Sequence, residues 1–270
     1  MIVPRTTRKE IMEKLGRKRR EGKPVFIASA GSGLVAQLLE EAGADCINTF
    51  SGARLRGNGM GTMAMLWPIL DSNAQTLRYT EEDILPAMRG KAFVCACLNA
   101  NDPLKDMRAV LRRCLDMGVP SVSNIGPSIS YVDKDSQVYR VLTQSGITFD
   151  EEDSLRMVEE AQPDIFCFHA GTTKGGRRGF DSGETIEETA QRTEEVIRKL
   201  RALKEDIFLV AHGAAMETPE DAQFILDHTS CDGFWTGSST ERIPIERAVS
   251  ETARRFAALG FRNPRRGEGA

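Results

Sequence analysis

Residues 207–239 read IFLVAHGAAMETPEDAQFILDHTSCDGFWTGSS, and this stretch decides the fold. It begins with one apolar run, 207–215, and ends with another, 233–239. Between them, Thr218-Pro219-Glu220-Asp221 is a helix-start signal, with a threonine N-cap, a proline in the first turn and acidic residues behind it. A helix between two apolar strands is the repeating unit of a parallel sheet covered by helices.

The same alternation extends over the rest of the chain. The runs are nearly continuous in apolar residues, as strands buried on both faces should be. Counting a weaker run at 146–149, there are eight of them: 24–30, 46–51, 92–100, 119–125, 146–149, 165–171, 207–215 and 233–239. Eight such units in 270 residues fit a (β/α)8 barrel, whose usual length is about 250 residues. We therefore predict an α/β fold, a single TIM-barrel domain over residues 1–270.

Helical segments and loops fill the intervals between these runs. Apolar residues at helical spacing predict helices at 33–43, 104–117, 185–204 and 242–259. Residues 1–22 are expected to form an extra N-terminal helix, and residues 261–270 a loose tail. The connections 52–73 and 172–184 are longer than usual βα loops, which on a barrel belong to the active-site face. Both are candidate lids.

The composition restricts the class of protein. A net charge of −3 gives no signal for a nucleic-acid or anionic membrane surface. The N-terminus lacks an apolar leader and no run is long enough to span a bilayer, so we expect a cytoplasmic protein. The six cysteines have no zinc-finger spacing and are interpreted as buried thiols in a reducing compartment. By analogy with other barrels, which often associate through their outer helices, we expect a homo-oligomer.

Two of the three histidines occupy matching places in the sequence. His169 lies near the end of the run 165–171, and His212 lies near the end of the run 207–215. Neighbouring strand ends would bring both imidazoles to the top face of a barrel, where they could transfer protons or bind a metal. The alternative is that each is a core histidine with satisfied hydrogen bonds. His228, late in a helix, is interpreted as a structural or surface residue.

Acids and amides also gather at strand ends, and Asp71 and Glu241 are the preferred candidates among them. Such carboxylates could bind a divalent cation or act as general acid and base. Turn formation is the competing explanation, especially for Asp102 before a proline and for Asn124. The sequence has no HExxH, paired CxxC or EF-hand motif, so it identifies no metal ligands.

An anion site is predicted at the end of the last run. Gly237-Ser238-Ser239-Thr240 ends that run just before a helix, so small residues would expose backbone amides at a helix N-terminus. With Gly213 beside it, this is where barrels often hold phosphate. The basic residues of the two long loops could close over the anion: Arg54, Arg56, Lys174, Arg177 and Arg178. The turn after the first run is not a dinucleotide fingerprint, because Ala36 stands where the third glycine would be.

Five motifs follow one another in the chain: IASAGSGLVAQLLEEAGAD, SGARLRGNGMGT, WPILDSNA, AHGAAMETPEDAQFIL and FWTGSSTERIPIERAV. Together they resemble the phosphoenolpyruvate hydrolase-like (phosphonopyruvate hydrolase-like) TIM-barrel family, also described as TIM-barrel signal-transduction proteins. The resemblance covers residues 5–260. In larger proteins, including a plant viral-resistance protein, this barrel follows an ATP-binding domain.

The resemblance also implies which strand-end residues form the site. They are Ser29, Gly31, Ser51, Gly52, Arg54, Asp71, Asn73, Asn99, Asp102, His169, Thr173, His212, Gly213, Ser238, Ser239 and Glu241. Between Val132 and Asp164 the chain is shorter than the family pattern, with only GITF where a fuller fifth strand is expected. A site residue from the fifth strand is therefore not assigned.

The expected function is a hydrolase or lyase that cleaves a C–C, C–P or phosphoester bond in a small 2-oxo-acid-like or phosphorylated carboxylate. Arg54 and the amides near Ser238 and Ser239 would hold the anionic metabolite, and His169 or His212 would move a proton. Asp71 or Glu241 would assist them, and a divalent cation such as Mg2+ would polarise a carbonyl.

Two alternatives to this reaction stay open. One is a non-catalytic metabolite-binding or regulatory module with the same pocket. The other is a Schiff-base aldolase, which is disfavoured because no lysine lies inside a predicted strand.

Overall fold

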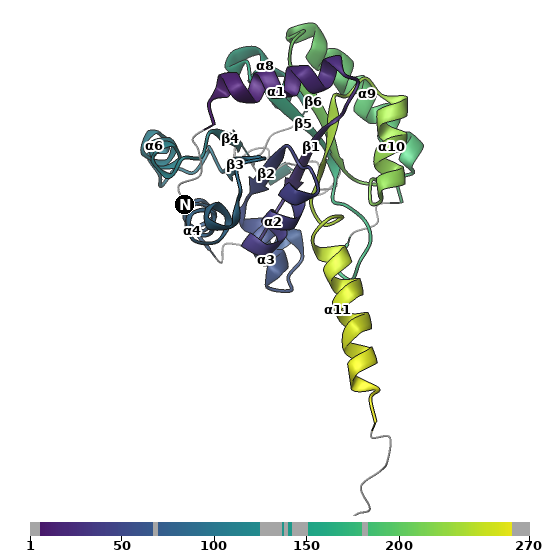
Figure 1. The fold of residues 1–270 in the computed structure, drawn as a ribbon. Coiled ribbons are helices and arrows are strands. Elements are labelled where there is room, and N and C mark those ends of the chain that lie inside the picture. The colour runs from purple at the N-terminus through teal and green to yellow at the C-terminus, as the bar shows by residue number, and fades with distance from the viewer. Residues whose placement is uncertain are drawn as a thin grey trace, which may run out of the picture.

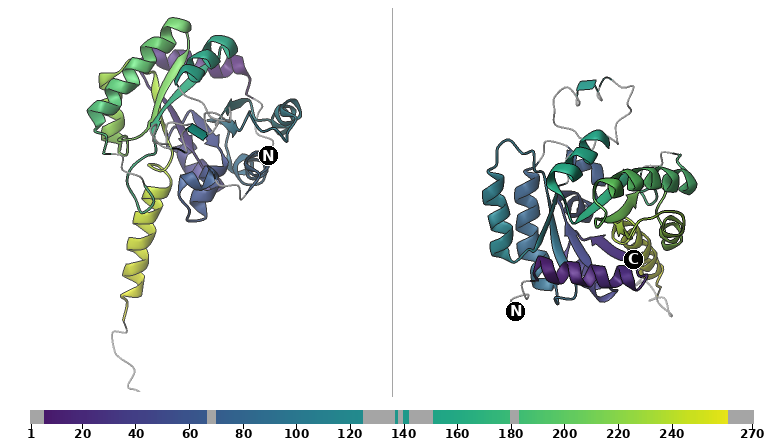
Figure 2. Two further views of the ribbon diagram at one scale, coloured as in Figure 1. Left: turned by 180° about the vertical axis from the view of Figure 1, so that it is seen from behind. Right: turned by 90° about the horizontal axis from the view of Figure 1, so that it is seen from above.

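Seven parallel strands form one sheet in the order β4-β3-β2-β1-β7-β6-β5, curled into a half-barrel (Figures 1 and 2). The computed structural model describes residues 6–66, 70–124, 137, 140–141, 151–179 and 183–260. The last strand pairs with the first, and β4 and β5 are the two edge strands of the described sheet. The strands are β1 (Val25–Ser29), β2 (Cys46–Thr49), β3 (Phe93–Leu98), β4 (Ser121–Asn124), β5 (Ile165–Gly171), β6 (Phe208–Gly213) and β7 (Gly233–Thr236).

Seven of the eight predicted runs are therefore strands, of which β5 has the predicted bounds and the other six are a little shorter than their runs. The α/β fold with a parallel sheet is confirmed. The eighth predicted strand, 146–149, lies outside the described residues, so the closed barrel stays a prediction.

Helices occupy all four predicted segments and also part of the first long loop. Thr218 caps α10 through a capping box with Asp221, as the helix-start signal predicts. Among the described helices, none is long and apolar enough to cross a membrane. The helices are α1 (Arg8–Arg20), α2 (Gly33–Glu41), α3 (Ser51–Gly57), η1 (Thr62–Leu66), α4 (Ser72–Tyr79), η2 (Thr80–Ile84), α5 (Leu85–Ala87), α6 (Met107–Met117), α8 (Glu151–Ala161), α9 (Ile186–Leu203), α10 (Pro219–His228) and α11 (Arg242–Ala257).

Helix α1 lies across the amino-terminal ends of the strands (Figure 1). Ile11 and Leu15 on its buried face pack against inward-facing strand residues, among them Val25 and Val210. Its basic residues pair with aspartates that stand one position before a strand. These pairs are Arg8–Asp164, Lys18–Asp45 and Arg19–Asp232. The amino-terminal end of the half-barrel is thereby covered, and the carboxyl ends of the strands form the opposite end.

Replacing Leu15 with alanine should lower the free energy of unfolding by about 2–5 kcal/mol, because the side chain is fully buried beneath the strands. Urea unfolding of the purified chain measures this change. The matched control is Leu115→Ala on α6, whose side chain is 63% exposed and should contribute little. Equal losses in the two variants would contradict the packing described for α1.

Candidate functional site

Two histidine rings meet at the carboxyl end of the sheet, one from β5 and one from β6. His169 and His212 are register partners on these adjacent strands. Their ring centroids are 4.5 Å apart and the rings stand at 86° to each other. The prediction that neighbouring strand ends bring the two imidazoles together is confirmed, whereas His228 lies on α10, stacked on Phe224.

Hydrogen bonds give the two rings opposite roles. His212 Nδ1 lies 2.6 Å from the carbonyl oxygen of Trp235, so this nitrogen carries the proton and Nε2 presents a lone pair. His169 Nδ1 accepts from the backbone N–H of Gly171 at 3.2 Å, which leaves the proton on Nε2. One imidazole is therefore arranged as a proton acceptor and the other as a donor.

Both rings are held neutral by their surroundings. Burial lowers the pKa of His212 to about 4, and the positive charge of Arg56 acts in the same direction. Burial, and then the neighbouring His212, lower the pKa of His169 well below its usual value. Neutral imidazoles near neutral pH are the form that general-base chemistry requires.

This lowered pKa should make the protein less stable as the pH falls from about 6.5 to about 4. In that window His212 takes up a proton in the unfolded chain but not in the folded chain. The free energy of unfolding therefore falls by up to about 3 kcal/mol. Urea unfolding at several pH values should show a smaller loss over this window for His212→Asn than for the wild type. If the free energy of unfolding fell equally with pH in the two proteins, His212 would not be the group that causes the loss.

A buried ion pair lies beside the histidines. The side chains of Arg56 and Glu241 are 2% and 4% exposed, and Arg56 Nη2 is 2.6 Å from Glu241 Oε2. Arg56 Nε also donates to Oε2 at 2.8 Å, and the backbone N–H of Gly31 donates to Oε1 at 2.6 Å. Glu241 therefore joins α3, the turn after β1 and the start of α11 at one point.

Two glycines lie among these groups, and at one of them no side chain fits. A Cβ atom on Gly237 would lie 3.5 Å from His212 Cε1 and 3.6 Å from Arg56 Nη1, so this residue sits between the ion pair and the ring. Gly213 has a φ of +87°, and a Cβ there would lie 1.9 Å from the carbonyl oxygen of Gly171. Only glycine fits at Gly213.

A chain of neutral polar groups runs along the inside of the half-barrel from β7 to β4. Trp235 Nε1 donates to Ser29 Oγ at 2.9 Å, and Ser29 Oγ lies 3.4 Å from Asn48 Oδ1. Asn48 Nδ2 lies 2.7 Å from Cys97 Sγ, which is 2.7 Å from Ser123 Oγ. These residues come from β7, β1, β2, β3 and β4 in order round the sheet. They form an uncharged floor for the site.

Several predicted site residues bind groups other than the histidines and the Arg56–Glu241 pair, although Arg54 also donates to the carbonyl oxygen of Gly31 at 3.3 Å. Asp71 caps α4 and pairs with Lys105, and this pairing and the N–H of Ala74 hold its pKa below the usual value. Arg54 pairs with Asp83 at 2.9 Å. The remaining residues form local contacts: Asn73 bonds Asn99 and Asp102, Ser51 bonds Ser72, and Gly52 packs closely against Phe50.

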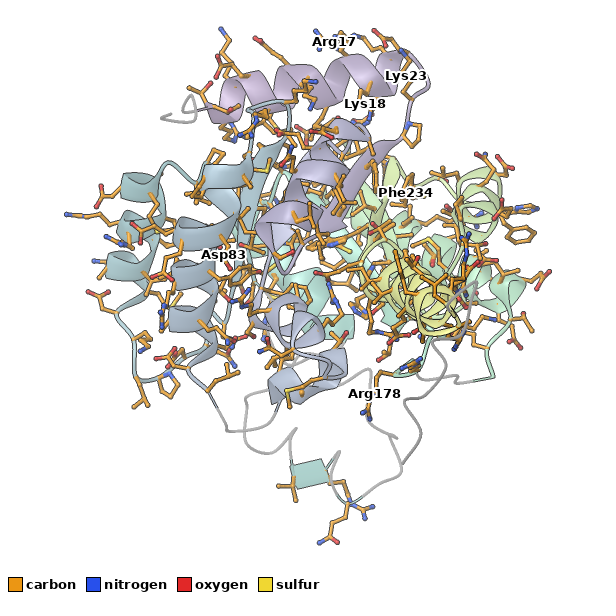
Figure 3. All side chains as sticks on the ribbon, turned by 60° about the horizontal axis from the view of Figure 1, so that its bottom comes forward. Arg17, Lys18, Lys23, Asp83, Arg178 and Phe234 are labelled. Atoms are coloured by element: carbon orange, nitrogen blue, oxygen red, sulfur yellow. The ribbon has the colours of Figure 1, made fainter. Side chains whose placement is uncertain are left out.

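The other predicted residues line the strand ends nearer the centre. Thr173 is buried in the loop after β5, and Ser238 is buried between β7 and α11, where its carbonyl accepts from the N–H of Ile243. Ser239 follows it and is half-buried. Arg178, in the loop after β5, is labelled in Figure 3.

Sequence reasoning did not single out Arg56, Asn48 or Trp235 as residues of the central site. In the sequence Arg56 is one of several loop cations, and its partner Glu241 follows 185 residues later. The strand-end position of Asn48, in the run CINTFS, was the only local signal available.

The donors at this site do not match what a hard divalent cation requires. Mg2+ prefers carboxylate oxygens, whereas the floor offers hydroxyl, amide and thiol groups, and Glu241 is already bound to Arg56 and Gly31. Within the part of the chain that the structure describes, no group of three or more His, Cys, Asp or Glu side chains is placed to hold a metal ion.

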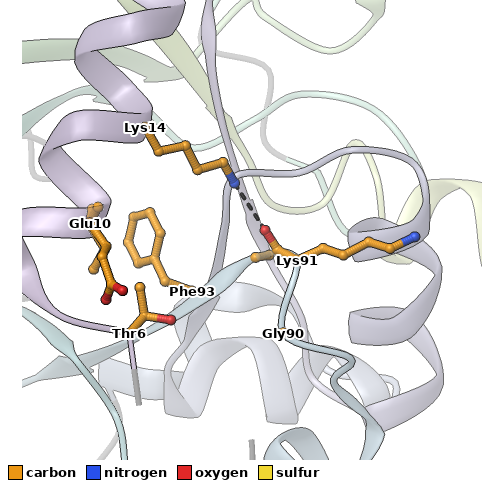
Figure 4. A pocket seen from close by; sticks show the side chains of 8 residues that line it. Thr6, Glu10, Lys14, Gly90, Lys91 and Phe93 are labelled. Carbon is orange, nitrogen blue, oxygen red and sulfur yellow. Dashed lines mark hydrogen bonds between the residues drawn. The ribbon is translucent and has the colours of Figure 1, made fainter. Parts of the chain in front are cut away.

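A pocket of about 270 Å³ lies at the opposite end of the molecule, between α1 and the start of β3 (Figure 4). Glu10, Lys14 and Phe93 are among its lining residues, and Lys14 Nζ donates to the carbonyl oxygen of Lys91 at 3.0 Å. It is separated from the histidines by the length of the strands, so it is not part of the candidate site.

Known proteins are similar to this chain over most of its length. The tomato (Solanum lycopersicum) ToMV susceptible protein tm-1(GCR26) is 28% identical over 280 residues, which cover 96% of this chain but 37% of the tomato protein. Phosphoenolpyruvate phosphomutase from Streptomyces platensis subsp. rosaceus has a TM-score of 0.56 at 16% identity, covering 91% of this chain and 87% of its own. A phosphonopyruvate hydrolase, solved as a complex with oxalate and Mg2+, has a TM-score of 0.51 at 14% identity with the same coverage.

These structures show the fold, and the family follows from the sequence. The family model described as phosphoenolpyruvate hydrolase-like matches residues 10–155 and 136–259, which together span most of the chain. The chain therefore belongs to the phosphoenolpyruvate hydrolase-like family.

Proposed function

We propose that this protein is a hydrolase or lyase that cleaves a C–C, C–P or phosphoester bond in a small 2-oxo-acid-like or phosphorylated carboxylate. The observation that carries the proposal is the pair of neutral imidazoles, with His212 arranged to accept a proton and His169 arranged to donate one. Two rings of opposite role, 4.5 Å apart at a strand end, suit proton transfer at one bound molecule.

In this scheme the backbone around Ser238 and Ser239 holds the anionic end of the substrate at the start of α11. His212 Nε2 removes a proton from the attacking water or from the substrate. His169 Nε2–H donates a hydrogen bond to the oxygen on which negative charge develops. The floor residues Ser29 and Asn48 offer hydrogen bonds to uncharged polar groups of the same molecule.

Other predicted residues have supporting roles in the proposal. Glu241 positions Gly31 and Arg56, and it does not transfer a proton itself. Asp71 and Arg54 act from the rim, where each is paired. No step of the proposed scheme uses a divalent cation, whereas Mg2+ accompanies oxalate in the phosphonopyruvate hydrolase complex.

A second candidate function is a metabolite-binding module without turnover. The Arg56–Glu241 pair favours it, because the buried carboxylate cancels the charge that would otherwise stabilise a developing anion. The two candidates share one binding site and differ only in whether a bond is broken.

Turnover assays on the purified full chain separate the two functions. Phosphonopyruvate, phosphoenolpyruvate and oxaloacetate are each incubated with the protein, once with EDTA and once with Mg2+, and the products are followed by 1H and 31P NMR. Product formation supports the enzyme. Oxalate binding by calorimetry without any product supports the binding module, and neither binding nor product overturns both.

A further inference from the structure

The charged side chains at the centre of the site cancel each other. Glu241 Oε2 lies 2.6 Å from Arg56 Nη2, and both side chains are buried, so solvent screens neither charge effectively. This pair lies close to the histidines, because a Cβ atom on Gly237 would contact both Arg56 and His212. A molecule bound beside His212 therefore meets a cation and an anion together, with no surplus of positive charge from the pair.

The other groups at the centre of the site are neutral. Burial lowers the pKa of both His169 and His212, so neither ring is charged at neutral pH. Asn48 on the floor is an uncharged amide, and burial raises the pKa of the Cys97 thiol beside it, so this thiol stays protonated. The start of α11 adds the partial charge of a helix N-terminus, about half an elementary charge. This balance suits a ligand with one negative charge.

Cations around the centre add little to that balance. Arg54, Arg192 and Arg242 each pair with a carboxylate, at 2.9, 2.8 and 3.0 Å. In the loop after β5, Lys174 is half-buried and Arg178 is exposed. Charges that reach solvent are screened and attract a bound anion less than a buried charge does. Arg56 is therefore the cation that would matter most for a second negative charge, and Glu241 already neutralises it.

We propose that the site selects a 2-oxo acid with a single negative charge over anions with two or more, and that Glu241 sets this selectivity. The inference rests on the proposed function and narrows its substrate class. The second charge of a dianion would face the buried carboxylate of Glu241 without a free cation beside it. Ser29 and Asn48 suit uncharged hydroxyl, carbonyl or amide groups of the ligand instead. Phosphonates and phosphorylated carboxylates, which carry two or more charges, are the disfavoured substrates.

Calorimetric titration of the full chain with oxamate and oxalate tests this selectivity. The two ions have nearly the same shape, but at neutral pH oxamate carries one negative charge and oxalate carries two. EDTA is present because oxalate chelates divalent cations. The wild type should bind oxamate at least about 10-fold more tightly than oxalate, a ratio that corresponds to about 1.4 kcal/mol. Equal affinities, a preference for oxalate, or binding of neither ion overturns the proposal.

The variant Glu241→Gln tests whether this residue sets the selectivity. Glutamine keeps an oxygen that can accept from the N–H of Gly31, and it leaves Arg56 as a buried cation without its counter-charge. Oxalate should then bind at least about 10-fold more tightly than oxamate. The matched control is Asp83→Asn, because Asp83 and its partner Arg54 are 35% and 38% exposed and solvent screens the freed charge. The control should keep the preference of the wild type.

The double variant Arg56→Met/Glu241→Gln keeps the test decisive if the single variant does not fold. It removes both members of the ion pair, so the site is again neutral and oxamate should still bind more tightly than oxalate. Circular dichroism shows which variants are folded. A preference for oxalate in the double variant, or an unchanged preference for oxamate in folded Glu241→Gln, contradicts the role of Glu241.

Turnover measurements separate a failure of this inference from a failure of the proposed function. Product formed from phosphonopyruvate or phosphoenolpyruvate, together with a preference for oxalate, would overturn the selectivity and leave the hydrolase or lyase standing. A preference for oxamate without product from any substrate would support the selectivity in a binding module instead of an enzyme.

Discussion

Replacing His212 with asparagine should lower turnover of the substrate by about 10²–10⁴-fold, the usual contribution of a general base. Asparagine keeps an N–H group that can donate to the carbonyl oxygen of Trp235, as His212 Nδ1 does at 2.6 Å. It removes Nε2, the nitrogen that takes up the proton in the proposed scheme. The loss should therefore fall on kcat, with the affinity for oxalate nearly unchanged.

The same experiment includes a matched histidine control. His228→Asn changes a ring that is exposed on α10 and hydrogen-bonded to the carbonyl oxygen of Phe224. Turnover by this variant should equal that of the wild type. His169→Asn should lower turnover as well, since that ring donates to the developing charge in the scheme. Retained turnover in both His169→Asn and His212→Asn would rule out the proposed chemistry.

The sheet could be predicted from the sequence because each of its strands and helices is marked by residues within that strand or helix. Each parallel strand is a short, nearly continuous apolar run, and the helices between them carry their own start and stop signals. Thr218 and Thr185 both cap their helices through capping boxes. The two histidines could be paired in advance because neighbouring strands of a βα sheet end at the same edge.

The centre of the site could not be predicted in the same way. Arg54 and Arg56 stand two residues apart on α3, and the sequence does not show which one faces inward. In the structure Arg54 reaches the rim and pairs with Asp83, whereas Arg56 is buried. That choice depends on Glu241, which approaches only when β7 pairs with β1. Interactions that depend on the closure of the sheet leave no local pattern.

The position of α11 was also beyond sequence reasoning. Residues 242–259 predict a helix correctly, because the apolar period and the length are local properties. In the structure Arg242 and Glu246 attach the base of this helix to the loop after β5, and residues 251–260 are exposed. An amphipathic stripe indicates only that a helix is covered, and gives no information about the covering chain.

Replacing Arg56 with alanine should be the most destabilising single change at the site, with a loss of about 3–5 kcal/mol in the free energy of unfolding. The reason is that Glu241 would be left as a buried carboxylate without its cation, since its side chain is 4% exposed. Its remaining partner, the N–H of Gly31, cannot neutralise a full charge. Urea unfolding at neutral pH measures this loss.

The double variant Arg56→Ala/Glu241→Gln separates the buried charge from lost packing. Glutamine keeps an oxygen that can accept from Gly31 and removes the charge, so the double variant should be more stable than Arg56→Ala alone by about 1–3 kcal/mol. If the double variant were instead less stable at neutral pH, Arg56 would act by filling space between α3 and β7. The ion pair would then not be what joins α3 to the turn after β1 and the start of α11.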